Sequence, residues 1–402
     1  MTALTWIAIG TLSLTGLIWL LNLLQLVTRS REMVFRITAD RDPEAPTGGA
    51  LVSVIIPARN EAGHIGPCLD TVLSQTWRDL EIIVLDDRSE DGTAAEAKER
   101  ADRDPRVRIV GGKERPEGWM GKVWACHTAQ QEATGEVLLF IDADVRLEPE
   151  AVRQTVQYIK TQQIEALSVF GRLTLASFWE WAVQPVIGGL ILQNNDPAQV
   201  NDPEKPDKVM ANGQFIMATR AGYDRAGGHA AIKGEILDDV GFARRCKQER
   251  VAYHMVYGRE LFSCRMYTSL SEIWAGWTKN LFAGLHYNVG LVLGICAALF
   301  VINILPFIAL GVRGLQVGLG GLPIADPILG LAALNVTLAY ISYIGGLRVA
   351  DYSARYFWTF PLGMLVTIGL FANSARRIAS GKGVSWKGRT YTTTGQGQRP
   401  SA

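Results

Sequence analysis

Two aspartates end a hydrophobic run near the middle of the chain. The run reads LLFIDADVRL over residues 138–147, so Asp142 and Asp144 stand one residue apart. Two carboxylates this close repel each other and resist burial unless a positive charge lies between them. Carboxylate oxygens at a strand end suit a hard divalent cation such as Mg²⁺ or Mn²⁺, which keeps open positions for phosphate oxygens. The spacing therefore predicts a metal site that neutralises a diphosphate, although many D-x-D sequences are only surface turns.

Two further acidic pairs follow apolar stretches. Asp86 and Asp87 end the run LEIIVLDD, and Asp238 and Asp239 lie in GEILDDVGF. Each pair has a simpler explanation. Asp86 and Asp87 are also typical of a helix N-cap cluster with Ser89, and Asp238 and Asp239 are also typical of a solvated helix start. A chemical role for either pair depends on the elements that position it.

Alternating strands and helices are predicted around the first acids. Short β-branched runs at 51–57, 80–87, 107–110 and 136–144 indicate buried strands, and helices are expected at 64–75, 93–101 and 123–134. This alternation predicts an α/β fold with an open, mostly parallel sheet. Ligands of such sheets bind at the carboxyl ends of the strands. Both the 86–87 pair and the 142–144 pair stand at such an end, so we expect one ligand to meet both.

The overall composition excludes some classes of function. The 402 residues carry a formal net charge of +1, which does not suggest a nucleic-acid partner. The five cysteines form no C-x-x-C pair, and their odd number fits no disulfide framework. We therefore expect reduced thiols in a cytoplasmic setting.

Long uncharged segments lie at both ends of the chain. Residues 1–28 carry no charge and are long enough to span a bilayer as a helix. A signal peptide is the competing interpretation, but no basic region precedes the run and no A-x-A site follows it. Arginines 29, 31 and 36 come directly afterwards and predict that the following domain is cytoplasmic in a multi-pass protein of the cell membrane.

Three more charge-free runs occur near the other end. They lie between Lys279 and Arg313, between Asp326 and Arg348, and between Arg355 and Arg376. Any one of them is also compatible with a buried core helix, but three in series favour membrane spans. The predicted domains are a transmembrane helix (1–28), a linker (29–50), a catalytic domain (51–286), a transmembrane region of about three hydrophobic segments (287–376) and a basic tail (377–402).

The number of spans conflicts with the charge of the tail. Three spans after a cytoplasmic domain would leave the tail outside, yet the tail carries five basic residues, which favour the inside: Arg376, Arg377, Lys382, Lys387 and Arg389. One apolar run is therefore expected to be re-entrant or interfacial. Prolines 306, 323 and 327 make 311–329 the weakest segment, but the sequence leaves the side of the tail open.

A family resemblance is carried by several motifs together. The stretch VSVIIPARNEAGHIGPCLDTVLSQTWRDLEIIVLDDRSEDGT, the later D-A-D and GEILDDVGFARR resemble, in this order, a family 2 glycosyltransferase of the GT-A fold. The resemblance covers about residues 51–285. It implies a Rossmann-like sheet with helices on both faces, a nucleoside-diphosphate-sugar donor and inversion at the anomeric carbon.

The resemblance also implies roles for particular residues. Pro57, Arg59 and Glu61 match the loop that meets the nucleotide, and Asp87 matches the aspartate that recognises the base. Asp142 is expected near the ribose or the metal, Asp144 is expected to bind the metal directly, and Asp239 matches the catalytic base. The family often has Glu-Asp where this chain has Asp238–Asp239, which keeps the base position.

Three further motifs carry a narrower resemblance. GWMGKVWAC (118–126), RMYTSLSEIWAGWTKN (265–280) and SWKGRTY (385–391) look like membrane glycosyltransferases that glucosylate carotenoid acids in bacteria. This resemblance implies a lipid acceptor, with UDP-glucose as the expected donor. Lys122 is expected against the donor diphosphate, although a surface lysine at a helix start is the alternative. A processive Q-x-x-R-W motif is absent, which predicts the addition of a single sugar.

Several alternatives stay open at this point. The acceptor is also compatible with a glycerolipid, a sphingolipid or a hopanoid-type lipid. The segment 177–193 and the motif at 265–280, both rich in tryptophan, suit either the membrane interface or a protein core. A sugar-nucleotide or phosphate-transferring membrane enzyme would also use clustered acids, but a Walker sequence is missing. A transporter would need ionisable residues within its spans, and a glycosidase would use two carboxylates without metal.

Overall fold

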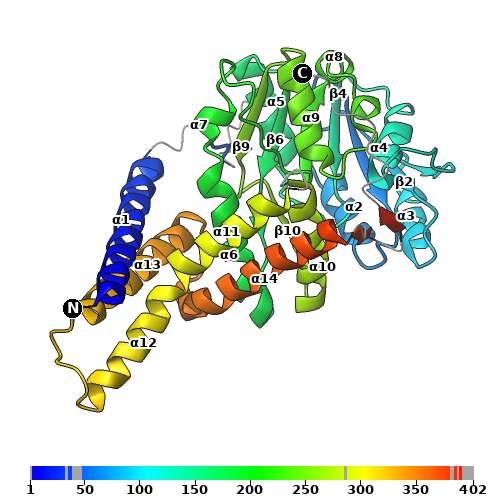
Figure 1. Cartoon of the computed structure of the whole chain (residues 1–402). Coiled ribbons are helices and arrows are strands. Elements are labelled where there is room, and N and C mark those ends of the chain that lie inside the picture. Colours follow the sequence, from blue (N-terminus) through cyan, green and yellow to red (C-terminus); the bar gives the residue numbers. More distant parts are fainter. Residues whose placement is uncertain are drawn as a thin grey trace. The chain divides into compact units, whose positions relative to one another are not determined.

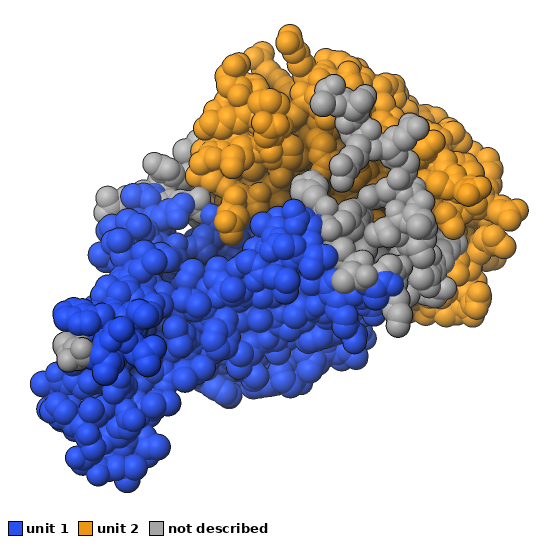
Figure 2. All heavy atoms as spheres, in the orientation of Figure 1, with its two compact units in different colours: residues 1–34, 176–193, 267–386 blue, residues 35–175, 194–266, 387–402 orange. Residues whose placement is uncertain are grey.

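The computed structural model describes residues 2–31, 35–38, 48–284, 288–380, 384–386 and 389–391. Within it the chain forms two compact units, which Figure 2 shows in blue and orange. Unit 1 comprises residues 1–34, 176–193 and 267–386, and unit 2 comprises residues 35–175, 194–266 and 387–402. Most of the predicted linker (29–50) and of the basic tail (377–402) lies outside the described residues, as do Lys387 and Gly388 of the SWKGRTY motif.

Unit 2 is built on a seven-stranded sheet (Figure 1). Four strands match the predicted ones: β1 (Val52–Ala58), β2 (Leu80–Asp86), β3 (Val107–Gly111) and β4 (Val137–Ile141). They lie in the order β3-β2-β1-β4 and are parallel to one another. The prediction of an open, mostly parallel α/β sheet is therefore confirmed.

The other half of the sheet contains one reversed strand. The strands are β8 (Phe215–Thr219), β6 (Ala166–Phe170) and β9 (Tyr253–Tyr257). β8 runs antiparallel between β4 and β6, while β6 and β9 are parallel to each other. A second, three-stranded sheet joins β5 (Val145–Leu147), β10 (Phe262–Cys264) and β7 (Arg172–Leu173). β4 ends directly before the D-A-D and β5 begins directly after it, so paired strands hold this motif at both of its ends.

Helices cover both faces of the seven-stranded sheet because its strands are apolar on both faces. Val54 and Ile56 of β1 pack into one buried cluster, whereas Ile55 packs into the other. This alternation follows from the two-residue period of a strand. The predicted helices appear as α2 (Ile65–Leu73), α3 (Thr93–Ala101) and α4 (Gly121–Gln130). The remaining helices of unit 2 are α5 (Ala151–Gln162), the short α7 (Pro197–Val200), α8 (Arg220–Arg225), α9 (Asp238–Gln248) and a 3₁₀ turn, η1 (His229–Ile232).

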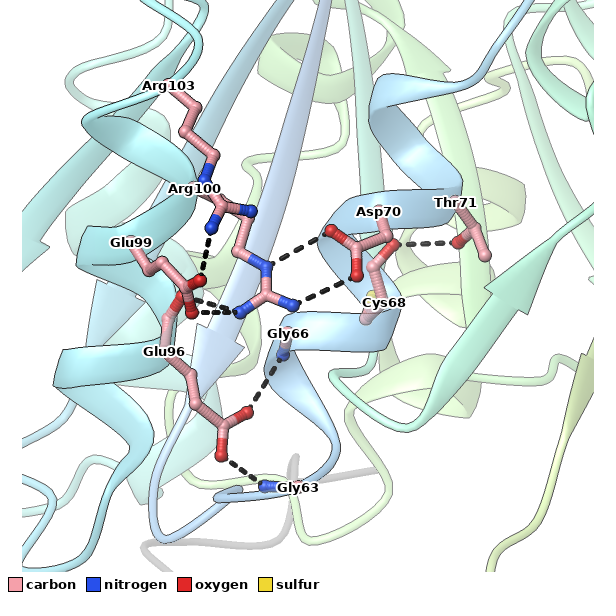
Figure 3. Close-up of polar contacts among 9 residues, drawn as sticks. All are labelled: Gly63, Gly66, Cys68, Asp70, Thr71, Glu96, Glu99, Arg100 and Arg103. Carbon is pink, nitrogen blue, oxygen red and sulfur yellow. Dashed lines mark hydrogen bonds and ion pairs between the residues drawn. The ribbon is translucent and has the colours of Figure 1, made fainter.

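An ion pair and a carboxylate cap join α2 to α3 (Figure 3). The guanidinium of Arg100 donates to both carboxylate oxygens of Asp70, at 3.1 and 3.0 Å. The carboxylate of Glu96 accepts hydrogen bonds from the backbone N–H groups of Gly63 (2.7 Å) and Gly66 (3.3 Å). No side chain of α2 itself caps its N-terminus. Helix α3 thus supplies the acceptor that the start of α2 lacks.

Unit 1 consists largely of apolar helices. These are α1 (Ala3–Arg31), α6 (Phe178–Asn194), α10 (Leu270–Gly284), α11 (Val289–Asn303), α12 (Leu305–Gly318), α13 (Pro327–Val349) and α14 (Phe360–Ala379), with a 3₁₀ turn, η2 (Ala354–Thr359), before α14. Across the ranges that the structure describes, four segments are long and apolar enough to cross a membrane, namely 3–28, 289–318, 327–349 and 354–377. Each overlaps one of the charge-free runs of the sequence, although the last three also include arginines.

The two tryptophan-rich segments belong to this apolar unit. Residues 176–193 and 267–284 pack with the long helices rather than with the sheet, although both precede residue 286. Trp277 of α10 is 8% exposed, and its indole N–H donates to Gln184 of α6 at 2.8 Å. The last described strands, β11 (Val384–Trp386) and β12 (Arg389–Tyr391), pair with each other within the third narrow motif.

Candidate active site

The predicted acids converge because three neighbouring strands end at one edge of the sheet. β1 lies between β2 and β4, and Ala58 of β1 is in register with Asp86 of β2. Asp87 follows β2 directly, and Asp142 follows β4 directly. All three strands are parallel, so their carboxyl ends share this edge. The structure thus places Pro57, Arg59, Asp87 and the D-A-D along one rim of the sheet.

On the β2 side of the rim, the chain is held by backbone contacts around Asp87. This residue is 5% exposed, and its backbone carbonyl accepts a hydrogen bond of 2.7 Å from the guanidinium of Arg59. Gly112, after β3, approaches so closely that a Cβ there would lie 2.8 Å from the Cα of Asp87. Asp86 accepts from the N–H of Ser89, but α3 begins only at Thr93 and its N-cap is Gly92. The pair therefore does not cap this helix.

The loop that contains Glu61 is fixed by the start of α3. The N–H of Glu61 donates to Thr93 Oγ1 at 2.7 Å, and the N–H of Ala62 donates to Asp91 at 3.1 Å. The next amide, that of Gly63, donates to Glu96. Three successive backbone donors are thus satisfied by side chains of one short segment. This explains how the predicted nucleotide loop obtains a defined shape without regular structure.

On the β4 side of the rim, a lysine bridges two acids. Lys122, in the first turn of α4, places Nζ 2.7 Å from Asp142 Oδ1 and 3.4 Å from Asp238 Oδ2. Burial lowers the pKa of Lys122, but the carboxylates of Asp142 and Asp238 outweigh it and hold the pKa well above its usual value. Lys122 is therefore charged at neutral pH. It provides a positive charge beside Asp142, between this residue and Asp238.

Asp239 lies next to this bridge. Its Oδ2 accepts from the N–H of Gly213 at 2.9 Å, and its Oδ1 accepts from the N–H of Val240 at 2.8 Å. Burial raises the pKa of Asp239 to about 6, the charge of Asp238 adds to this shift, and Lys122 with the two N–H groups opposes it. An acid with this pKa is ionised at neutral pH yet basic enough to accept a proton.

Two participants were not predicted as site residues. Asp238 had been given no role, but it is the second partner of Lys122. Gly213 lies where a Cβ would be 3.3 Å from Lys122 Nζ and 3.4 Å from Asp239 Oδ2. Its loop is fixed to β6 by Asn212, which exchanges hydrogen bonds with Ser168. The sequence signal was weak: a single Asn-Gly pair before an apolar stretch.

Asp144 has the features of an incomplete cation site. Its Oδ1 is buried and accepts no hydrogen bond from the described part of the chain. Burial, together with the negative charges of Asp142 and Glu61, raises the pKa of Asp144 to about 7. A divalent cation would relieve this repulsion, and oxygen ligands suit Mg²⁺ or Mn²⁺. The residues therefore fit such an ion.

The chain alone does not complete a coordination shell there. Among the described residues, no group of three or more His, Cys, Asp or Glu side chains is arranged to hold a metal ion. One or two carboxylates with further ligands from substrate phosphates and water are the usual arrangement for Mg²⁺. Asp144 would be the principal protein ligand, and Asp142 is the nearest candidate for a second.

The two tryptophans of the first narrow motif form an aromatic cluster. Trp119 and Trp124 pack edge to face with ring centroids 5.0 Å apart, and His127 lies 4.8 Å from Trp119. Both tryptophans are only half-buried, and Trp119 also packs against the buried cluster on its face of the sheet. They flank Lys122 in the sequence, one just before α4 and one in its first turn.

Part of this chain is similar to a known protein family. Residues 53–226 match the family described as "Glycosyl transferase family 2". This match begins in β1 and ends after α8, so it contains the rim with Arg59, Asp87, Lys122, Asp142 and Asp144.

Curated relatives align along most of the chain. A protein of Staphylococcus haemolyticus (strain JCSC1435) named 4,4'-diaponeurosporenoate glycosyltransferase is 25% identical over 365 residues, which cover 89% of this chain and 92% of that protein. The protein of the same name from Staphylococcus aureus (strain MRSA252) is 24% identical over 367 residues, covering 85% and 88%. The likeness thus extends beyond the family match into the apolar helices.

A solved structure has the same fold. It is a mannosyltransferase from Pyrobaculum calidifontis in complex with GDP-Man and Mn²⁺, with a TM-score of 0.54 and 19% sequence identity. The likeness covers 94% of this chain and 99% of that one. It confirms the GT-A type of sheet for unit 2 together with flanking helices.

Proposed function

We propose that this chain is a family 2 glycosyltransferase that transfers one hexose, with inversion, from a nucleoside diphosphate sugar to a carotenoid in the membrane. UDP-glucose is the donor that we propose. The observation that carries the proposal is the cluster of Lys122, Asp142, Asp238 and Asp239 at the carboxyl edge of the sheet. It combines a cation for a leaving diphosphate with a buried base.

The donor end of the reaction would use the rim between β2 and β4. Asp87 and the loop of Arg59 and Glu61 receive the nucleotide, in a region already ordered by hydrogen bonds. Lys122, held between Asp142 and Asp238, would present its positive charge to a diphosphate oxygen as the glycosidic bond breaks. A divalent cation held by Asp144 would supply further neutralisation of the leaving diphosphate. Fixed charges of this kind act where negative charge develops.

The acceptor end would use Asp239. Two backbone N–H groups fix both carboxylate oxygens, which sets the direction from which a proton is accepted. An acceptor hydroxyl would give its proton to Asp239 as its oxygen attacks the anomeric carbon. An acceptor carboxylate is already ionised near neutral pH, so Asp239 would then orient it without removing a proton. The cost of losing Asp239 therefore depends on the chemistry of the acceptor.

The lipid acceptor is supported by two observations. The staphylococcal relatives are named for a carotenoid acid and align along most of this chain. The four apolar segments would keep the enzyme in the membrane in which such an acceptor dissolves. Arginines 29, 31 and 36, after the uncharged run 1–28, support a cytoplasmic position for the catalytic unit. Nucleotide sugars are made in the cytoplasm.

The test is a transfer assay with defined partners. Membranes that contain the full chain are incubated with radiolabelled UDP-glucose, UDP-galactose or GDP-mannose, and with a carotenoid that ends in a carboxyl or a hydroxyl group. We expect one hexose per polar end of the pigment, detected by mass spectrometry of the extract. Membranes that lack the chain provide the background.

Two outcomes would change the proposal in different ways. Unchanged pigment together with a newly labelled glycerolipid, sphingolipid or hopanoid would keep the transferase and reject the carotenoid. Label that remains in the nucleotide sugar, or that appears as a sugar phosphate, would instead favour a sugar-nucleotide or phosphate-transferring enzyme.

A further inference from the structure

If all four candidate spans crossed the membrane, the start of α1 and the end of α14 would lie on the same side of it. With α1 ending on the cytoplasmic side, crossings by 289–318, 327–349 and 354–377 would put the end of α14, with Arg376 and Arg377, outside. We propose instead that α14 lies along the cytoplasmic leaflet and does not cross, so its partner is the lipid surface of that leaflet. This inference rests on the proposed cytoplasmic position of the catalytic unit.

Helices α1 and α13 run in the same direction, side by side (Figure 1). Near their middles, Thr15 Oγ1 donates to Asn335 Oδ1 at 2.8 Å. Toward their C-terminal ends, a Cβ on Gly345 would lie 2.7 Å from the side chain of Leu26. Residue numbers thus rise together along both helices. The C-terminus of α13 therefore lies on the same side of the membrane as the arginines that follow α1, which is the cytoplasmic side.

Helices α12 and α13 form an antiparallel hairpin. Phe307 near the start of α12 packs against Tyr340, with ring centroids 5.5 Å apart. At the other end, Arg313 lies 4.0 Å from Asp326, which caps the start of α13. The turn between these helices is therefore at the N-terminal end of α13, on the outer side. Helix α12 therefore runs outward, and α13 returns.

The far end of α14 is tied to helices that begin on the cytoplasmic side. Helix α10 starts four residues after unit 2 ends and has 15 residues. At 1.5 Å per residue it is about 22 Å long, shorter than a hydrocarbon core of roughly 30 Å. It also carries Glu272 and Lys279. Helix α10 therefore does not cross, and α11, which begins five residues later, starts on the cytoplasmic side.

Contacts place the C-terminal half of α14 beside these two helices. Asn373 Nδ2 lies 3.1 Å from Thr278 Oγ1 of α10, and Phe371 shares a buried cluster with Val292 of α11. Earlier in α14, a Cβ on Gly369 would lie 3.0 Å from Trp274 of α10. The end of α14 thus lies near the start of α11, while Phe360 at its own start comes eleven residues after α13 ends and packs against Tyr343 of α13. Both ends of α14 are then on the cytoplasmic side.

The surface of α14 agrees with this position. Of its 18-residue window, 44% is buried inside the protein, compared with 22% for each of the other three candidates. Its exposed apolar side chains include Leu362 and Leu365, one helical turn apart, and they lie on the same stripe as Arg376 in its last turn. Trp358, just before α14, is 54% exposed. One narrow apolar stripe with an aromatic and a basic residue suits a helix that rests in a leaflet.

Cysteine accessibility in intact cells tests the arrangement. Single cysteines are introduced as Ala325→Cys (between α12 and α13), Ser353→Cys (between α13 and α14) and Ser380→Cys (after α14), in a background whose five native cysteines are replaced by serine. Lys208→Cys marks the catalytic unit, and each variant is first checked for transferase activity. A membrane-impermeant maleimide should label only the Ala325 position before permeabilisation, and all four positions afterwards.

The outcomes separate this inference from the proposed orientation. Labelling of both the Ala325 and Ser380 positions in intact cells would show that α14 crosses and would overturn the inference. Labelling of the Lys208, Ser353 and Ser380 positions but not of Ala325 would reject the cytoplasmic position of the catalytic unit, and with it the assigned leaflet. Both ends of α14 would still lie on one side of the membrane.

Quenching by lipid depth gives an independent measurement. A fluorophore is placed in turn at Leu362→Cys, Leu365→Cys and Ala372→Cys, in bilayers with quenchers at a shallow or a deep position on the acyl chain. A helix along the leaflet predicts a similar shallow depth at all three positions. A crossing helix predicts depths that differ by up to about 15 Å over these ten residues, which would overturn the inference.

Discussion

Asp87 and Asp142 follow strands on either side of β1, yet their surroundings differ. Around Asp87, the polar groups of the loop are satisfied by backbone and side-chain hydrogen bonds, such as those from Arg59 and to Thr93 and Glu96. Around Asp142, the structure concentrates charge. One lysine lies between two carboxylates, and two further carboxylates, of Asp144 and Asp239, have raised pKa values.

Under the proposed function, this difference separates two tasks within one site. A nucleoside needs a receptor of fixed shape, and the β2 side provides it through a loop whose amides already have acceptors. Bond breakage needs charges that are poised before the substrate arrives, and the β4 side provides them at the expense of electrostatic repulsion. Substitutions on the β4 side should therefore reduce turnover, whereas those on the β2 side should reduce donor affinity.

The largest effect is expected at Asp144. The Asp144→Ala variant should lose transfer to the background level, because the principal protein ligand for a divalent cation is missing. A chelator should do the same to the wild type, and added Mg²⁺ or Mn²⁺ should restore activity. Asp102→Asn, on the exposed end of α3, is the matched control and should keep full activity. Undiminished transfer in excess chelator would exclude the metal.

The second-largest loss of activity is expected at Asp239. For a hydroxyl acceptor, Asp239→Asn is expected to lower kcat on the order of 10²-fold or more, since the proton acceptor is lost. Donor binding, measured by titration with the labelled nucleotide sugar, should stay within about threefold, because asparagine keeps one oxygen toward the N–H groups. For a carboxylate acceptor the loss should be much smaller. If donor binding disappears along with turnover, Asp239 supports the structure and is not the base.

The pH dependence of kcat tests how the charges on the β4 side set the pKa of Asp239. With a hydroxyl acceptor, activity should fall as the pH drops through about 6, because protonated Asp239 cannot accept a proton. Asp238→Asn removes a negative neighbour that raises the pKa of Asp239, so this decline should move to lower pH. Lys122→Met removes a positive neighbour, so it should move to higher pH. Shifts of the same sign in both variants would contradict the arrangement.

The sequence predicted much of unit 2 because its signals are local. The β-branched runs identified β1 to β4, and the acids at their ends were placed on the correct edge by the rule for parallel sheets. The segment TAAEAKERA became α3 without a change of boundary. Such features need only neighbouring residues, and these are visible in the chain.

What the sequence could not give are contacts between distant segments. The pairing of Lys122 with Asp238 spans more than a hundred residues and depends on how α4 and α9 are packed. The reversed strand β8 was not predicted, because an apolar strand reads the same in either direction. In unit 1, the shared direction of α1 and α13 rests on packing between opposite ends of the chain.

The smallest effect is expected on the β2 side, at Glu96. Glu96→Ala removes the acceptor of the Gly63 and Gly66 N–H groups and so loosens the loop that includes Glu61 (Figure 3). We expect the KM for the donor to rise roughly three- to tenfold, equal to about 0.7–1.4 kcal/mol, with kcat within about twofold. Glu99→Ala is the matched control. Glu99 lies on the same helix but pairs with Arg100 and Arg103 and does not accept from the Gly63 and Gly66 amides, so its loss should leave both constants nearly unchanged. A fall in kcat at constant KM in Glu96→Ala would show that the loop serves bond breakage as well, and the division of tasks between the two sides would not hold.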